Sequence, residues 1–235
     1  MRLKLLVIGT IISLYVNAQT PIGAWESISV SDNGDKLRSI MIFAEGYQVL
    51  TIYNAASGKF IHTNGGTWNL NGETMTERIE FHTDKPSLVG TESSFKVAVS
   101  NDSLKLIGSN RFFKRIDDAT TGTLQGAWLM SGRVKDGITQ MRDTSTPRKT
   151  MKILSGTRFQ WIAYNTATKE FLGTGGGTYT AKNDGYMELI EFFSRDDTKA
   201  GQALKFQYKL IDGNWHHSGL SSKGDAIHEI WSIRK

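Results

Sequence analysis

Histidines, tryptophans and a carboxylate gather close to the end of the chain, where three of its five histidines lie. The gathered residues are Trp215, His216, His217, His228, Glu229 and Trp231. A histidine takes up and releases a proton near neutral pH, which suits it to general acid–base catalysis. Tryptophan rings offer flat surfaces against which the ring of a small ligand can stack. The cluster therefore indicates either proton-transfer chemistry or the binding of a ring-shaped ligand.

An earlier segment adds an arginine, a tryptophan and a tyrosine. Arg158 can hold a carboxylate or a sulfate through two parallel hydrogen bonds, and Tyr164 can assist a histidine in proton transfer. Side chains alternate between the two faces of a strand, so Arg158 and Tyr164 share one face and Trp161 lies on the other. Glu188 and Glu191 fall on opposite faces of a later strand for the same reason.

The same alternation places the adjacent His216 and His217 on opposite faces, and the sequence leaves open which of them faces the interior. Adjacent histidines on a strand cannot easily ligate one zinc ion, even with His228 nearby, so a zinc site is disfavoured. The glycine run 173–177 lacks the lysine and the helix of a phosphate loop, so we expect a turn or a barrel bend there. No other stock catalytic motif occurs, and we predict no cofactor and no metal.

The chain contains two copies of one sequence pattern, which indicates two copies of one structural unit. Segments 53–95 and 164–206 align without a gap, 111 residues apart. The matched pairs include Tyr53 and Tyr164, Phe60 and Phe171, Gly66 and Gly177, Glu77 and Glu188, Glu80 and Glu191, Phe81 and Phe192, and Phe95 and Phe206. A Gly-Ala-Trp triplet precedes each segment, ending at Trp25 and at Trp128. This second spacing is 103 residues, so the second copy carries about eight extra residues near 141–150.

Each copy reads as a series of short strands. Turn residues recur about every 8 to 12 positions between β-branched and aromatic segments, and helical periodicity is absent after the first residues. We therefore predict an all-β protein in which each copy is an antiparallel barrel or sandwich. The predicted domains are residues 19–118 and 123–235, joined by the polar stretch 117–123.

Residues 1–18 are predicted to be a secretory signal peptide. Arg2 and Lys4 precede an apolar run that ends at Val16-Asn17-Ala18, with small residues where a signal peptidase needs them. The apolar run is shorter than a membrane span, and the chain has no cysteine to carry a lipid. We expect a periplasmic or secreted protein without a membrane anchor. Its remaining 26 basic and 23 acidic residues form no basic run, so we do not expect nucleic acid as a partner.

The chain resembles a known family. Gly-x-Trp at the start of an exported antiparallel barrel looks like the lipocalin superfamily. The Gly176-Gly177-Thr178-Tyr179 segment, the strand 188–192 and the closing segment 228–231 resemble the lipocalin-like domains of exported Bacteroidetes proteins. The chain is also similar to barrel proteins of polysaccharide-utilisation loci in marine Bacteroidetes, which include an oligosaccharide dehydratase of ulvan breakdown. The resemblance implies an all-β fold of two tandem antiparallel lipocalin-like barrels and, more specifically, lyase chemistry on carbohydrate.

Carried onto this sequence, the dehydratase resemblance implies cofactor-free elimination of water from a uronate-containing oligosaccharide. Arg158, Trp161 and the segment 215–217 have no counterparts of the same type in the first copy, so we expect the site in the second barrel. His216 or His217 would be the acid–base group and Tyr164 its partner, with Glu188 or Glu191 as an orienting group. The substrate would contact Arg158, Trp161, Glu188, Trp215, Glu229 and Trp231.

Hydrolysis by paired carboxylates stays open as a variant. The alternatives are a non-catalytic module that binds a small apolar or sugar ligand, and an exported structural domain. The oligomeric state is left open.

Overall fold

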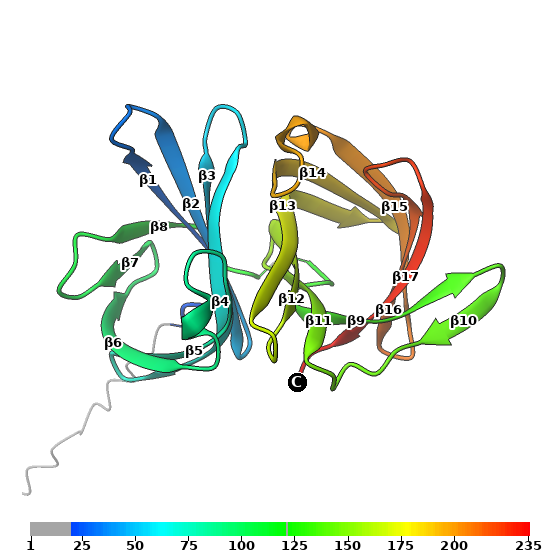
Figure 1. Cartoon of the computed structure of the whole chain (residues 1–235), viewed down its shortest axis with the longest axis horizontal. Coiled ribbons are helices and arrows are strands. Elements are labelled where there is room, and N and C mark those ends of the chain that lie inside the picture. Colours follow the sequence, from blue (N-terminus) through cyan, green and yellow to red (C-terminus); the bar gives the residue numbers. More distant parts are fainter. Residues whose placement is uncertain (1–19, 121) are drawn as a thin grey trace, which may run out of the picture.

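Each half of the chain closes into an eight-stranded antiparallel barrel, and the two barrels lie side by side (Figure 1). This computed structural model describes residues 20–120 and 122–235, so the predicted signal peptide lies outside the described residues. The predicted fold class, all-β with two tandem lipocalin-like barrels, is confirmed. None of the helices in the described part of the chain has the length and apolar character needed to span a bilayer.

Barrel 1 is a meander in which each strand pairs with the next, and β8 returns to pair with β1. A short 3₁₀ helix, η1 (Pro86–Leu88), follows β5. The strands are β1 (Gly23–Val30), β2 (Lys36–Ala44), β3 (Tyr47–Asn54), β4 (Phe60–Asn71), β5 (Thr74–His82), β6 (Glu92–Val99), β7 (Ser103–Leu106) and β8 (Phe112–Asp117).

Barrel 2 repeats this meander and closes where β17 pairs with β9. It also contains the 3₁₀ helix η2 (Asp197–Lys199). The strands are β9 (Gly126–Lys135), β10 (Ile138–Met141), β11 (Arg148–Leu154), β12 (Arg158–Asn165), β13 (Glu170–Lys182), β14 (Gly185–Phe193), β15 (Ala203–Ile211), β16 (Asn214–Leu220) and β17 (Ala226–Ile233). β10 forms a hairpin with β9 that extends away from the ring, and the extra residues of the second copy lie in and after this hairpin (Figure 1).

A tryptophan closes one end of each barrel, as the Gly-Ala-Trp triplets suggest. Trp25 is fully buried and its indole N–H donates to the carbonyl of Pro21 at 2.7 Å. Trp128 repeats this contact with the carbonyl of Leu124 at 2.8 Å. The indole N–H is thus satisfied while the ring fills the barrel, so both tryptophans have a packing role.

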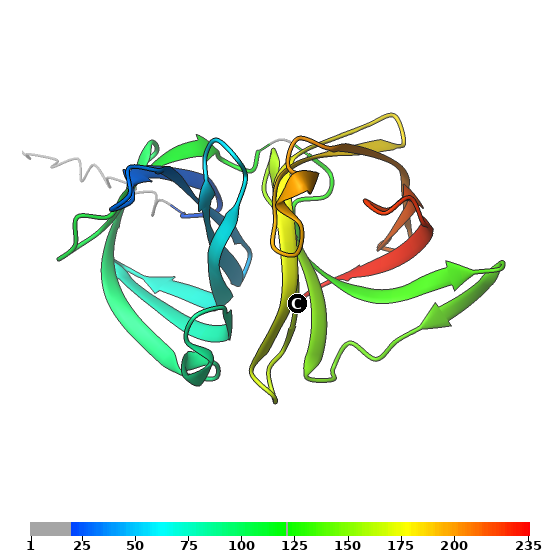
Figure 2. The same cartoon turned by 45° about the horizontal axis from the view of Figure 1, so that its top comes forward.

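The barrels contact each other through β2, β3 and β5 of barrel 1 and β11, β12 and β13 of barrel 2 (Figure 2). Parts of β2 and β11 are buried on both faces, since one face lines a lumen and the other meets the second barrel. Burial is therefore continuous over 40–44 and over 151–155 instead of alternating. A single apolar cluster draws residues from both barrels, among them Ile42, Val49 and Ile153. We call this contact the inter-barrel interface.

Two glycines let a bulge form at the same place in each barrel. The strand register shifts between Gly65 and Gly66 in barrel 1 and between Gly176 and Gly177 in barrel 2. The run 173–177 is therefore a bent strand, as expected, and not a phosphate loop. A Cβ at Gly177 would lie 2.0 Å from the carbonyl oxygen of Leu189, so the backbones approach too closely for any other residue.

Replacement of Gly177 by alanine is expected to lower the free energy of unfolding by about 2–3 kcal/mol, because the added methyl group must push the strands β13 and β14 apart. Urea unfolding followed by tryptophan fluorescence measures the loss. Gly185→Ala is the control, since its Cβ would meet only the Lys182 carbonyl oxygen at 3.2 Å, and it should cost less than about 1 kcal/mol. Equal losses in the two variants would contradict the role given to the close approach.

Candidate functional site

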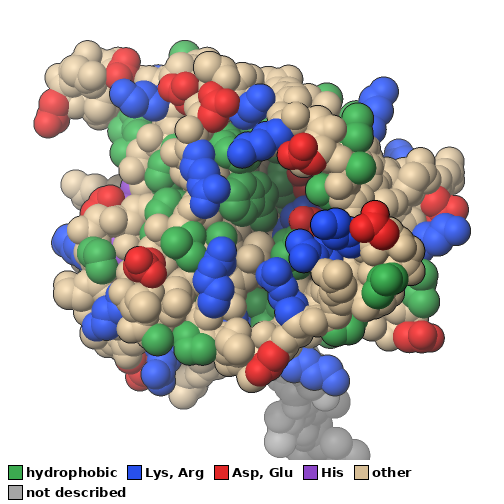
Figure 3. Space-filling model, turned by 45° about the vertical axis from the view of Figure 1, so that its right-hand side comes forward, with side chains coloured by type: hydrophobic (Ala, Val, Ile, Leu, Met, Phe, Trp, Pro, Cys, Tyr) green, Lys and Arg blue, Asp and Glu red, His purple; other side chains and the backbone are tan. Residues whose placement is uncertain are grey.

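The lumen of barrel 2 is the candidate site. It holds a cavity of about 280 Å³ whose wall is mostly apolar, with contributions from Trp161, Phe193, Leu204 and Phe206. Figure 3 shows the hollowed face of this barrel, with hydrophobic side chains on its wall and several Lys and Arg side chains around it. A concave, mostly apolar site with a few polar groups is the usual form of a small-molecule pocket.

A buried ion pair lies at the inner end of the cavity. Lys152 Nζ and Glu188 Oε1 are 2.8 Å apart, and each residue is only 4% exposed. The Tyr186 hydroxyl donates to the same carboxylate oxygen at 2.9 Å. Burial, and then the charge of Glu188, raise the pKa of Tyr186, so this hydroxyl remains a donor.

Aromatic rings surround the ammonium group of Lys152. Its Nζ lies 5.1 Å from the ring centres of both Trp215 and Trp231, and 5.6 Å from that of Tyr186. Ring faces carry partial negative charge and attract a cation at such distances. The rings and the carboxylate of Glu188 together explain how a lysine is tolerated inside the barrel.

His217 is the second polar feature of the cavity. It is 2% exposed and packs against Phe206, with ring centres 4.0 Å apart. Its Nδ1 lies 3.5 Å from Glu229 Oε2, at the long limit for a hydrogen bond. Apart from this long contact, neither ring nitrogen has a hydrogen-bond partner among the described residues.

Burial lowers the pKa of His217, and the positive charge of Lys152 lowers it further. Burial alone would raise the pKa of Glu229, but His217, Lys152 and the Trp231 indole N–H outweigh it and lower the pKa. The Trp231 indole donates to Glu229 at 3.2 Å. The cavity therefore presents a neutral imidazole beside an ionised carboxylate at neutral pH.

The structure brings six of the predicted site residues together around this lumen. They are Trp161, Glu188, Trp215, His217, Glu229 and Trp231. Of the two adjacent histidines, His217 faces the interior. His216 lies on the outer face, where its Nδ1 is 3.2 Å from Nε2 of His228. Of the two alternatives that the sequence leaves open, His217 is therefore the one in the pocket and His216 is not, because β16 is a regular strand and only alternate side chains enter the barrel.

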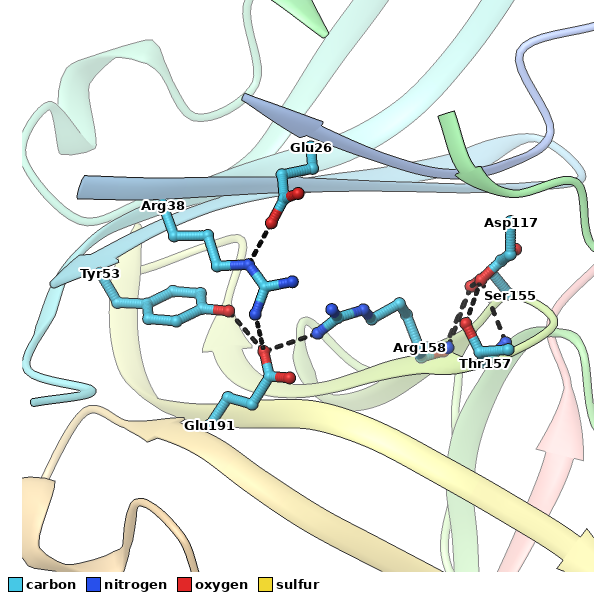
Figure 4. Close-up of polar contacts among 8 residues, drawn as sticks. All are labelled: Glu26, Arg38, Tyr53, Asp117, Ser155, Thr157, Arg158 and Glu191. Carbon is cyan, nitrogen blue, oxygen red and sulfur yellow. Dashed lines mark hydrogen bonds and ion pairs between the residues drawn. The ribbon is translucent and has the colours of Figure 1, made fainter. Parts of the chain in front are cut away.

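Arg158, Glu191 and Tyr164 do not share this cavity, so the prediction of one common pocket is also wrong for them. They lie in the inter-barrel interface, on the opposite face of their strands from Trp161 and Glu188. Figure 4 shows Glu191 accepting hydrogen bonds from Arg158 at 2.5 Å, from Arg38 at 3.0 Å and from Tyr53 at 2.5 Å. The expected carboxylate clamp therefore holds a carboxylate of this chain.

The Tyr164 hydroxyl makes the equivalent contact from barrel 2 to barrel 1. It donates to Glu80 of barrel 1 at 2.5 Å and accepts from Arg234 at 3.0 Å. Burial, and then the charge of Glu80, raise the pKa of Tyr164 well above its usual value. Tyr53 and Tyr164 thus each bind a glutamate of the opposite barrel, and the two pairs correspond to each other in the repeat.

The aromatic contacts between the barrels also occur in equivalent pairs, one from each barrel to the other. Tyr53 stacks on Phe192 with ring centres 4.9 Å apart, and Tyr164 packs on Phe81 at 5.0 Å. Phe60 stacks almost parallel to Phe171, its own counterpart, at 5.9 Å.

The end of barrel 1 is fixed to barrel 2 by one carboxylate. Asp117 accepts from the hydroxyls of Ser155 and Thr157 at 2.7 Å (Figure 4). It also accepts from the backbone N–H of Gly156 at 3.1 Å. This contact sets where the connecting segment leaves barrel 1.

Sequence reasoning missed Lys152 and Tyr186. A usable signal existed for Lys152, since a lysine interrupts the apolar segment 151–154 where the first copy has Met41. Tyr186 stands where the first copy has Met75. Among the residues that the structure describes, no group of three or more histidine and acidic side chains is arranged to hold a metal ion.

Tyr164→Phe is expected to lower the free energy of unfolding by about 1–2 kcal/mol, because it leaves the largely buried Glu80 carboxylate and Arg234 with one partner fewer. Tyr53→Phe, the matched variant, should cost a similar amount, and chemical denaturation measures both. Ligand binding in barrel 2 should be unchanged in the Tyr164 variant. A loss of binding with unchanged stability would return Tyr164 to the functional site.

The comparisons agree with the boundaries of barrel 2. Residues 123–233 match the model of a family described as a domain of unknown function, DUF4488. No curated protein matches the chain. The similarity to an oligosaccharide dehydratase therefore stays a prediction.

Proposed function

We propose that barrel 2 is a binding module for a compact ligand with a ring-shaped or otherwise apolar body and one neutral hydrogen-bonding group. The observation that carries this proposal is His217, a buried imidazole whose Nε2 has no hydrogen-bond partner in the described structure and whose Nδ1 has only the 3.5 Å contact with Glu229. Leaving a buried polar group unpaired costs about 1–3 kcal/mol, so a ligand that pairs with it recovers that cost on binding.

The chemistry of the imidazole defines the head group of the ligand. A neutral imidazole donates from one nitrogen and accepts at the other. A hydroxyl group of the ligand can accept from the imidazole N–H or donate to the other ring nitrogen. The carboxylate of Glu229, beside the imidazole, offers a further acceptor. A phenol, an alcohol or the hydroxyl of a sugar ring meets these requirements.

The charges in the lumen favour a neutral head group over an anion. Lys152 is already paired with Glu188, and Glu229 adds a second carboxylate. An anion placed beside His217 would therefore meet unfavourable charge. The apolar wall, which includes Trp161 and Phe193, suits the body of the ligand.

The pair 4-ethylphenol and ethylbenzene tests this proposal, since the two molecules differ by one hydroxyl group. We expect the phenol to bind about tenfold more tightly, the value of one hydrogen bond to His217. Titration followed by the NMR signals of the Trp161, Trp215 and Trp231 indoles reports on this cavity directly.

His217→Leu should remove most of the difference between the two molecules while ethylbenzene still binds. Leucine suits a barrel of this kind, because Leu106 stands at the equivalent position of barrel 1. His216→Leu is the matched control and should change neither affinity. Binding of the phenol that is unaffected by His217→Leu, or the absence of any binding, would refute the proposal.

Elimination of water from an anionic sugar is the second candidate function. Two observations favour it: a buried histidine with a lowered pKa, and the Lys and Arg side chains gathered around the hollow (Figure 3). His217 would take the proton from the carbon beside the carboxylate, and that electron pair would form a carbon–carbon double bond. The hydroxyl group on the next carbon would leave as water with the proton returned by the imidazolium, so the atoms balance.

This second function predicts turnover that the binding module lacks. Oligosaccharides that end in a saturated uronic acid, which keeps the proton beside the carboxylate and a hydroxyl on the next carbon, should lose the mass of one water when incubated with the protein, and His217→Leu should abolish the loss. Tyr164→Phe should retain it, because this tyrosine lies in the inter-barrel interface. Binding without any loss of water, measured by mass spectrometry on the same samples, would exclude the elimination and leave the binding module.

A further inference from the structure

Barrel 1 contains a second and larger cavity. Its volume is about 520 Å³, and its wall is formed largely by methionine, leucine, phenylalanine and valine side chains. The equivalent positions of barrel 2 carry Lys152, Trp161, Tyr186, Trp215 and His217, where barrel 1 has Met41, Leu50, Met75, Leu104 and Leu106. These replacements remove bulk and polar atoms from the lumen, which accounts for the larger volume.

One polar group of the lumen is nevertheless the same in both barrels. Glu77 of barrel 1 corresponds to Glu188 of barrel 2, and the strand pairing agrees, since Glu77 lies opposite Trp68 as Glu188 lies opposite Tyr179. In barrel 2 this carboxylate receives Lys152 at 2.8 Å and the Tyr186 hydroxyl at 2.9 Å. In barrel 1 both donors are replaced by methionine.

The Glu77 carboxyl therefore lacks partners of its own. It lines the cavity and makes no hydrogen bond or ion pair with any residue in 20–120 or 122–235. Burial raises its pKa to about 7. Such a group is half ionised near neutral pH and gains most from a ligand that supplies the missing cation.

We propose that barrel 1 binds a small primary amine with an apolar body, whose ammonium group pairs with Glu77 in the way that Lys152 pairs with Glu188 in barrel 2. The lysine of barrel 2 acts as a built-in equivalent of this ligand: an ammonium group on an aliphatic chain, inserted between apolar side chains and held by a carboxylate. Barrel 1 has the carboxylate of Glu77 and a larger cavity, which can hold the ammonium group and the aliphatic chain of the ligand.

Other charged groups also line this cavity, and they bear on the pH dependence of binding. They are His62, His82, Asp84, Lys85 and Arg111. Asp84, Lys85 and Arg111 are exposed, and His62 is held by Asp84 with Nδ1 and Oδ2 2.8 Å apart. Of the two acidic groups in the lining, Glu77 is the one that corresponds to Glu188, the partner of Lys152 in barrel 2.

Hexylamine, hexan-1-ol and hexanoate are the probes, because they share one apolar body and differ only in head group. Isothermal titration calorimetry on the whole protein should show that hexylamine binds at least tenfold more tightly than hexan-1-ol and that hexanoate does not bind. Glu77→Gln, which keeps the size and removes the charge, should weaken hexylamine at least tenfold. Glu73→Gln removes the same charge from an exposed position nearby and should leave the affinity unchanged.

Two further measurements separate Glu77 from the rest of the lining. Hexylamine stays protonated throughout, so its affinity should rise about tenfold from pH 6 to pH 8 as Glu77 ionises, and Glu77→Gln should abolish the rise. A rise that persists in Glu77→Gln would come from His62 and His82 and would overturn the proposal. Met41→Lys supplies the ammonium group within the chain and should abolish hexylamine binding, provided that its unfolding midpoint stays near that of the parent.

Equal affinity for hexylamine and hexan-1-ol, no effect of Glu77→Gln, or no binding of any probe would each refute the amine site. These outcomes leave the proposal for barrel 2 untouched, because that proposal rests on His217 and on probes without an amine.

Discussion

Glu191 accepts hydrogen bonds from Tyr53 and Arg38 of barrel 1 and from Arg158 of its own barrel, within an apolar surface shared by both barrels. A carboxylate removed from water is stable only with such a complete set of donors. Strands β2, β3, β11 and β12 depend on this contact, since their outward faces would otherwise expose a continuous apolar surface to solvent. The interface therefore determines which face of each of these strands is left to form a lumen.

This constraint explains which parts of the site were predictable from sequence. The repeat and the turn spacing indicated the barrels, because both depend on local sequence patterns. Alternation separated Trp161 from Arg158, but it could not tell which of them enters the lumen. A charged residue normally faces water or a ligand pocket, and here the outward face of β12 meets a second barrel instead. The prediction that Arg158 lines the lumen is therefore wrong, because the rule behind it assumes that the outer face of a barrel strand meets solvent.

Lys152 escaped prediction for a related reason. A lysine is seldom buried, so sequence reasoning places it on the surface unless a partner can be named. Its partner Glu188 comes from β14, and its aromatic surroundings come from β14, β16 and β17, which no local pattern connects to β11. The comparison of Met41 with Lys152 becomes informative only once the register of both barrels is known. The two lumens then differ in this respect: Glu188 of barrel 2 is paired with Lys152, whereas Glu77 of barrel 1 has Met41 at the position of that lysine.

The contacts between the barrels come in pairs with exchanged roles, since Tyr53 binds Glu191 while Tyr164 binds Glu80. Phe60 and Phe171 meet where such an arrangement would place its two-fold axis. Because Tyr53 and Glu80 lie on one barrel, a single copy carries both halves of the contact, as in an isologous homodimer. In a true homodimer, however, every substitution would change both pockets at once. Joining the two copies in one chain removes this restriction, so that one lumen can acquire a lysine while the other keeps a methionine.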